Sequence, residues 1–175
     1  MAKPRILVTR KLTDPVEARL AADYDATFNP SDRPMPAAAL AAAMRDHDAL
    51  VPTVSDRIAA GMLQAEGCRV RMIANVGVGF SNIDTEAARD AGIAVSNTPD
   101  VLTDATADTA MLLILSATRR AFAAEKMLRA GRWGGFSIVD GLGTSIQGKV
   151  LGIIGMGRIG RATARRAAAG FGMEI

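Results

Sequence analysis

Residues 148–160 read GKVLGIIGMGRIG and place three glycines directly after a short apolar run. The spacing Gly155-x-Gly157-x-x-Gly160 suits the binding of a dinucleotide pyrophosphate at the start of a helix. The first glycine permits a tight turn, the second leaves space for phosphate, and the third lets the helix pack on the strand. The apolar run 150–154 predicts that strand. The stretch therefore predicts the first βα unit of a Rossmann domain.

The predicted unit is unfinished within this sequence. After the glycines, Gly160, Ala164 and Ala168 form a small-residue stripe that we expect to pack against the sheet. The acidic residue that binds an adenine ribose typically lies about 20 residues beyond the glycines. Residues 173–175 only begin the second strand. The sequence therefore predicts an NAD or NADP site without distinguishing the two cofactors.

The first hundred residues alternate between short apolar runs and helical patterns, which is typical of βαβ units and a parallel sheet. We expect one doubly wound α/β domain over residues 1–99. The predicted strands are residues 6–8, 24–28, 49–51, 71–76 and 93–95, and the predicted helices are 14–22, 36–45, 56–64 and 84–90.

The pattern changes in residues 103–130, which contain neither Gly nor Pro. They predict a single helix about 42 Å long, with Thr103 as its N-cap. Its centre is apolar on every side, so we expect burial on more than one face. We interpret it as a helix linking two domains, 1–99 and 100–175; the alternative is an ordinary core helix of a single domain.

Composition excludes several classes of function. The chain has 175 residues and a net charge of +3, with no long Lys/Arg block, so no nucleic-acid partner is expected. No apolar stretch approaches the roughly 18 residues that span a membrane, and no secretory signal is present, which predicts a cytoplasmic protein without a membrane partner. With one cysteine, Cys68, and one histidine, His47, no metal site is expected.

A second glycine loop, NVGVGFSNID, occupies residues 75–84 after a predicted strand. Ligands of open α/β sheets bind at the carboxyl ends of the strands. Gly77 and Gly79 would let backbone amides face a small anion such as a carboxylate. The spacing alone favours the alternative, a structural turn leading into the next helix.

Four stretches together resemble the D-isomer-specific 2-hydroxyacid dehydrogenases: NVGVGFSNID, SNTPDVLTDATADTAMLLIL, AGRW and GKVLGIIGMGRIG. The segment NTPDVLTDATAD is most similar to the glyoxylate and hydroxypyruvate reductase branch. The resemblance implies a flavodoxin-like substrate domain, a long linking helix and a Rossmann domain, with the active site in the cleft between domains. It also implies a homodimer formed through the long helix and the segment after it.

The resemblance assigns roles to individual residues. The amides of Val76 and Gly77 would bind the substrate carboxylate, Val78 would lie near the nicotinamide, and Thr106 would approach the cofactor. The pyrophosphate would be lined by the glycine loop, namely Gly155, Met156, Gly157, Arg158, Ile159 and Gly160.

In the family, a His protonates the carbonyl oxygen of a 2-oxo acid, a neighbouring acid supports that His, and an Arg binds the substrate. The resemblance places none of these catalytic residues in this chain, and His47 does not match the catalytic position. We therefore expect an N-terminal portion of a dehydrogenase that is inactive alone. Two alternatives are a non-catalytic binding or corepressor-like module, and a flavodoxin-like domain with a chance glycine motif.

Overall fold

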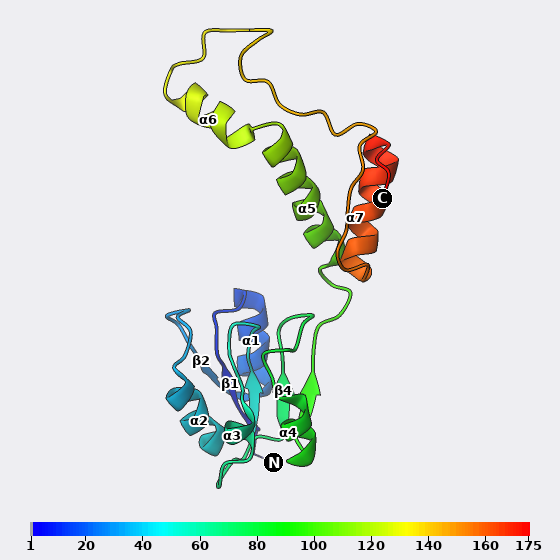
Figure 1. Cartoon of the computed structure of the whole chain (residues 1–175). Helices are drawn as coiled ribbons and strands as arrows, with labels where there is room; N and C mark the ends of the chain where they lie inside the picture. Colours follow the sequence, from blue (N-terminus) through cyan, green and yellow to red (C-terminus); the bar gives the residue numbers. More distant parts are fainter. Residues whose placement is uncertain (1) are drawn as a thin grey trace. The chain divides into compact units, whose positions relative to one another are not determined.

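The computed structural model describes residues 2–175, and the chain divides into two compact units at Pro99. Unit 1 runs to Pro99, and unit 2 covers Asp100–Ile175 (Figure 1). Unit 1 holds a parallel sheet with its helices, and unit 2 is built mainly from helices. Each unit has its own cluster of buried apolar side chains.

The sheet of unit 1 confirms the α/β prediction. All neighbouring strands are parallel, and their order is β2-β1-β3-β4-β5. This is the flavodoxin-like order, in which the direction of winding reverses between β1 and β3. The strands are β1 (Arg5–Val8), β2 (Asp25–Phe28), β3 (Ala49–Val51), β4 (Met72–Ala74) and β5 (Ala94–Ser96).

One row of side chains across the sheet forms the core of unit 1. Leu7 pairs with Leu50 and Leu50 pairs with Ile73 in the strand register, and all three are buried. Because side chains alternate along a strand, this row lies on one face of the sheet. It packs in one cluster with Met44 and Leu63 from two helices. The helices of unit 1 are α1 (Asp14–Asp23), α2 (Ala37–Asp46), α3 (Ala60–Leu63) and α4 (Thr85–Asp90).

Helix α3 is shorter than the predicted helix 56–64, because the residues before it make other contacts. The buried Asp56 carboxylate accepts hydrogen bonds from the Thr53 amide at 2.8 Å and the Thr9 hydroxyl at 2.6 Å. Ile58 donates its amide to the Asn82 carbonyl at 2.8 Å. These bonds hold residues 53–58 as a turn and an extended segment.

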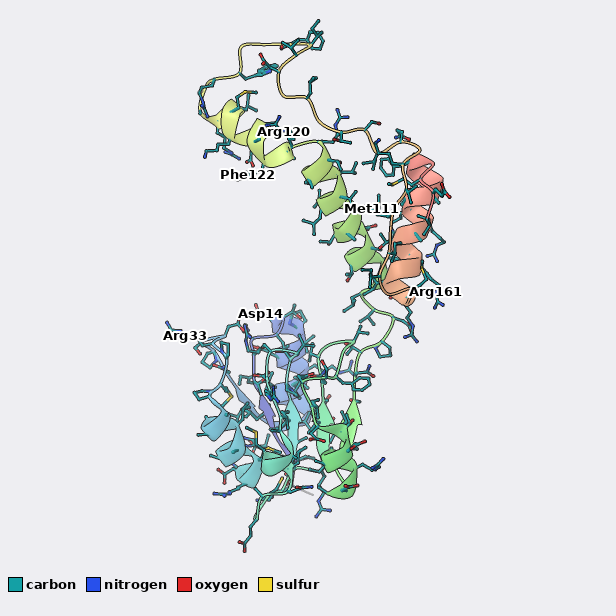
Figure 2. The ribbon with its side chains drawn as sticks, viewed as in Figure 1. Asp14, Arg33, Met111, Arg120, Phe122 and Arg161 are labelled. Carbon is teal, nitrogen blue, oxygen red and sulfur yellow. The ribbon has the colours of Figure 1, made fainter. Side chains whose placement is uncertain are left out.

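The prediction of one helix over residues 103–130 was wrong. Helix α5 covers Thr103–Thr118 and α6 covers Ala121–Arg129, and Arg120 between them has a left-handed φ of 55° (Figure 2). The Thr118 carbonyl, at the end of α5, accepts a hydrogen bond from the Thr144 amide at 2.7 Å. This bond from a distant segment occupies a carbonyl that the next turn of a continuous helix would use. The N-cap is Leu102, so Thr103 lies inside the first turn.

Helices α5 and α7 (Arg158–Phe171) pack side by side in unit 2 (Figure 1). Met111 and Ala167 belong to its buried cluster, and Ala162 and Thr163 are also buried. The small-residue stripe predicted at Gly160, Ala164 and Ala168 was therefore misplaced, since Ala168 is exposed. The face of α7 that is buried is the one that meets α5.

An ion-pair cluster also joins these two helices. Arg166 on α7 donates to Asp104 at 3.0 Å and to Asp108 at 2.6 Å, both on α5. The hydrogen bonds that Arg166 donates to Asp104 and Asp108 raise the pKa of its guanidinium. The two carboxylates thus link α5 to α7 through one guanidinium.

The predicted strand 150–154 is not a regular strand. Leu151 donates its amide to the Glu174 carbonyl at 2.7 Å, and Glu174 donates to the Lys149 carbonyl at 3.1 Å. These bonds form one isolated parallel bridge between Val150 and Glu174. A parallel bridge at this point matches the start of the second Rossmann strand, which residues 173–175 predicted. Among residues 2–175, no helix has the length and apolar character needed to cross a membrane.

Candidate functional site

The loop after β4 is held through its carbonyl groups. The Thr98 amide donates to the Gly77 carbonyl at 3.0 Å, and the Asn97 side-chain amide donates to the Val78 carbonyl at 2.8 Å. The Asn75 side-chain amide donates to the Gly79 carbonyl at 2.9 Å. Three consecutive peptide carbonyls of the loop are therefore fixed by hydrogen bonds.

The amides of the same loop divide into two pairs. The Val76 amide donates to the Pro52 carbonyl at 2.8 Å, and the Gly77 amide donates to the Thr98 hydroxyl at 3.1 Å. Within residues 2–175, the amides of Val78 and Gly79 donate to no protein group. Two adjacent free N–H groups can bind one small anion. The two amides predicted for the carboxylate thus already have partners, whereas the next two are available.

A side chain at position 77 would collide with Val54 unless the exposed Val54 side chain moved. A Cβ atom on Gly77 would lie 2.3 Å from the Val54 Cγ1 atom. Val54, Val76 and Phe80 are all exposed apolar side chains in this part of unit 1.

A buried polar network that the sequence reasoning missed supports the loop. Asn75 is 1% exposed, and its side-chain oxygen accepts a hydrogen bond from Asn82 at 3.2 Å. The Asn82 amide also donates to the carbonyls of Thr53 at 3.2 Å and Asp56 at 3.1 Å. Asn75 and Asn97 each directly follow a strand, β4 and β5. Their position directly after a strand could have identified them from the sequence, since ligands of parallel sheets bind at the carboxyl ends of the strands.

The glycine loop of unit 2 has the geometry that a pyrophosphate requires. Gly155 has a φ of 98°, which favours glycine, and a Cβ on Gly160 would lie 2.2 Å from the Gly155 carbonyl oxygen. Gly157 is the N-cap of α7, with no heavy atom within 4 Å of its Cβ position. The turn at Gly155 and the open position at Gly157 leave room for a pyrophosphate, so the residues fit the group, and their role in cofactor binding stays a prediction.

The first turn of α7 offers backbone donors for that group. Arg161 is the first residue of α7 whose amide has an intrahelical partner: it donates to the Gly157 carbonyl at 3.0 Å. The amides of residues 158–160 lie before it and have no intrahelical acceptor. Of the other residues predicted to line the pyrophosphate, Met156 is exposed and Ile159 is half-buried. This helix start has no acidic residue that would compete with phosphate.

The Arg158 side chain has a partner that the sequence did not reveal. Its Nε atom lies 2.6 Å from the Asp100 carboxylate, and both side chains are more than half exposed. With Thr103, Arg161 and Arg165, they line a hollow of about 230 Å³ in unit 2. Exposed ion pairs of this kind stabilise little, so Arg158 remains available to an anion. Thr106 is half-buried in the first turns of α5.

The single histidine has a structural environment. His47 is buried at the C-terminal end of α2, where its Nδ1 atom lies 2.8 Å from the Ala43 carbonyl oxygen. Its Nε2 atom lies 3.3 Å from the Thr27 hydroxyl. Both ring nitrogens therefore have local partners.

Comparisons with known proteins agree with these features. Residues 6–169 match the family model of the D-isomer specific 2-hydroxyacid dehydrogenase, catalytic domain. The glyoxylate reductase of Thermococcus kodakarensis is 42% identical over 177 residues, which cover 99% of this chain and 53% of that protein. The glyoxylate reductase of Aeropyrum pernix is 41% identical over 179 residues, covering 100% of this chain and 53% of that protein. The chain thus spans about half the length of the curated relatives it matches.

Two solved structures extend the similarity to the fold. A putative NAD-binding D-isomer specific 2-hydroxyacid dehydrogenase from Polaromonas sp. superposes with a TM-score of 0.88 at 39% identity, covering 98% of this chain and 53% of that one. An NADPH-dependent glyoxylate/hydroxypyruvate reductase from Sinorhizobium meliloti, in complex with NADP and malonate, gives 0.76 at 36% identity, covering 96% and 51%. With the loop and the glycine turn described above, these matches lead to one conclusion: the chain belongs to the D-isomer-specific 2-hydroxyacid dehydrogenase family.

Proposed function

We propose that the chain is the N-terminal portion of an NAD(P)-dependent dehydrogenase that reduces a small 2-oxo acid of the glyoxylate or hydroxypyruvate type. The observation that carries this proposal is the pair of unpartnered amides at Val78 and Gly79, in a loop where three consecutive carbonyls are held by hydrogen bonds. The names of the similar glyoxylate reductases support the choice of substrate class.

The loop over residues 76–79 is proposed to bind the substrate carboxylate. Val78 and Gly79 donate their free amides to its oxygens, and charge-assisted bonds of this kind are the stronger ones. Val76 keeps its bond to Pro52, and Gly77 joins the site only if the carboxylate displaces the Thr98 hydroxyl.

The glycine loop is proposed to hold the cofactor pyrophosphate, as its sequence predicted. When bound, a nicotinamide cofactor supplies the hydride for the reduction. The amides of Arg158, Ile159 and Gly160 donate to the phosphates, and Gly155 and Gly157 leave the backbone accessible. The Arg158 guanidinium can turn from Asp100 to a phosphate oxygen. Thr106 and Met156 remain proposed contacts of the same cofactor.

The 175-residue chain alone is expected to show no turnover. Reduction of a carbonyl requires a proton donor at the oxygen, and removal of a general acid typically costs about 10²–10⁴ in rate. The only histidine of the sequence, His47, is buried with both ring nitrogens occupied. The measurement is loss of NADH or NADPH absorbance with glyoxylate or hydroxypyruvate. Oxidation that depends on the 2-oxo acid and exceeds the buffer rate would contradict this expectation.

We also propose that the chain forms a homodimer through α6 and the segment that follows it. Phe122, Trp133, Phe136 and Ile138 are all exposed there, and Phe136 is 91% exposed. Figure 2 shows Phe122 directed away from the ribbon of α6. Exposed apolar patches of more than a few hundred Å² mark interaction sites.

The Phe136→Asp variant is therefore expected to sediment as a monomer where the parent chain sediments as a dimer. A charge buried in an apolar interface is strongly unfavourable. Val16→Asp, at an exposed apolar position on α1 in unit 1, is the matched control and is expected to remain dimeric. Equal sedimentation of the two variants would argue against this interface.

A further inference from the structure

We propose that Asn97 is a positioning residue, which aims the amide of Gly79 at the substrate carboxylate, beside the Val78 amide. This inference rests on the function proposed above for the same loop. The Asn97 side-chain amide donates to the Val78 carbonyl at 2.8 Å, and the next residue, Thr98, donates its backbone amide to the Gly77 carbonyl at 3.0 Å. Two consecutive residues after β5 thus hold two consecutive peptides of the loop.

The direction of each free amide follows from the planarity of the peptide. In a trans peptide, the N–H group points opposite to the carbonyl of the same unit, and the described residues contain no cis peptide. The Val78 carbonyl and the Gly79 amide share one peptide, so the bond from Asn97 directs the Gly79 N–H away from β5. The Gly77 carbonyl and the Val78 amide share the preceding peptide, so the bond from Thr98 likewise directs the Val78 N–H away from the segment after β5.

Steric contacts do not fix the orientation of the peptide between Val78 and Gly79. A Cβ at Gly77 would meet Val54, so the backbone there is crowded, but no heavy atom lies within 4 Å of the Cβ position of Gly79. Glycine also populates more backbone conformations than any other residue. The orientation of the 78–79 peptide therefore depends on hydrogen bonds, and Asn97 supplies the one to its own carbonyl.

The role assigned to Asn97 is distinct from general stabilisation of unit 1. Asn97 is half-buried, and its side-chain amide has a carbonyl of the binding loop as its partner. Asn29 offers a matched comparison in the same unit. It is also half-buried and directly follows a strand, β2, and its side-chain amide donates to the carbonyls of Thr9 and Arg33, each at 2.8 Å.

The test compares Asn97→Ala and Asn97→Leu with Asn29→Ala in the 175-residue chain. Leucine keeps the volume of the asparagine side chain but has no donor. Two quantities are measured: NMR order parameters of the Val78 and Gly79 amides without ligand, and the dissociation constant of oxamate, a carboxylate analogue of a 2-oxo acid. The sheet amides of β1 and β3 report whether each variant is folded.

We expect both Asn97 variants to lower the order parameter of the Gly79 amide, with a smaller change at Val78, whose peptide Thr98 still holds, and to weaken oxamate binding by about fivefold or more, the effect of one lost hydrogen bond. Asn29→Ala is expected to leave both quantities unchanged. Folded Asn97 variants with parental order parameters and affinity would overturn the inference. If the parent chain does not bind oxamate but the Asn97 variants still loosen the loop, the proposed substrate site fails while the role of Asn97 in orienting the loop stands.

Discussion

Replacing Gly160 by alanine is expected to disrupt the start of α7 and to abolish nucleotide binding by unit 2. The added Cβ would lie 2.2 Å from the Gly155 carbonyl oxygen, a backbone atom that cannot rotate away. Overpacking of this kind typically costs about 1–3 kcal/mol. Because Gly155 itself has a φ of 98°, its turn has little freedom to adjust, and the amides of residues 158–160 must move apart from the loop.

Gly170 on the same helix provides the matched control. Its Cβ position has no heavy atom within 4 Å, and its φ is not positive. Alanine is favoured over glycine in a helix by up to about 1 kcal/mol, so Gly170→Ala is expected to leave α7 unchanged or more stable. The two substitutions add the same methyl group and should therefore act in opposite directions.

Amide hydrogen exchange of α7 measures the difference between the two variants. We expect faster exchange throughout α7 in Gly160→Ala and unchanged or slower exchange in Gly170→Ala, with unit 1 unaffected in both. Equal protection of α7 in the two variants would show that the close approach of Gly160 to Gly155 is not required.

The elements that the sequence predicted well are those whose signal is local. Short apolar runs between helical patterns predicted the strands at 6–8 and 49–51 to within a residue, since each strand is set by its own side chains. The glycine turn was equally readable, because the φ of Gly155 is a property of that residue.

Elements that depend on distant partners were predicted less well. The break after α5 involves the Thr144 amide at the Thr118 carbonyl, and the short α3 reflects the bonds of Asp56 to Thr9 and Thr53. Neither interaction leaves a periodic pattern in the sequence.

The same distinction applies to the candidate site. The loop over residues 75–84 was identified from its glycines and its place after a strand, but the availability of each amide depends on remote groups. Val76 is bonded to Pro52 and Gly77 to Thr98, each more than 20 positions away in the chain. The structure therefore shifts the proposed donors to Val78 and Gly79, while the loop itself is the one that the sequence indicated.

Joining residues 1–175 to the remaining half of the Thermococcus kodakarensis glyoxylate reductase is expected to give an active enzyme. The matched region of that protein is 42% identical to this chain and covers 53% of its length. The added half would supply the catalytic residues that the family resemblance places there, and this chain would supply the carboxylate loop and the glycine turn. General acid catalysis alone is worth about 10²–10⁴ in rate, so the gain over the 175-residue chain should be at least about 100-fold.

Glyoxylate-dependent oxidation of NADH or NADPH by this chimera is the most direct measurement of the proposed function. Two reference proteins accompany it: the intact Thermococcus enzyme, which shows that the assay works, and the chimera with Gly160→Ala, which should lose activity if the glycine turn of this chain binds the cofactor. We predict activity in the chimera and its loss in the variant. A folded chimera that binds NADH or NADPH but shows no turnover with glyoxylate or hydroxypyruvate would contradict the dehydrogenase proposal and favour a non-catalytic binding module.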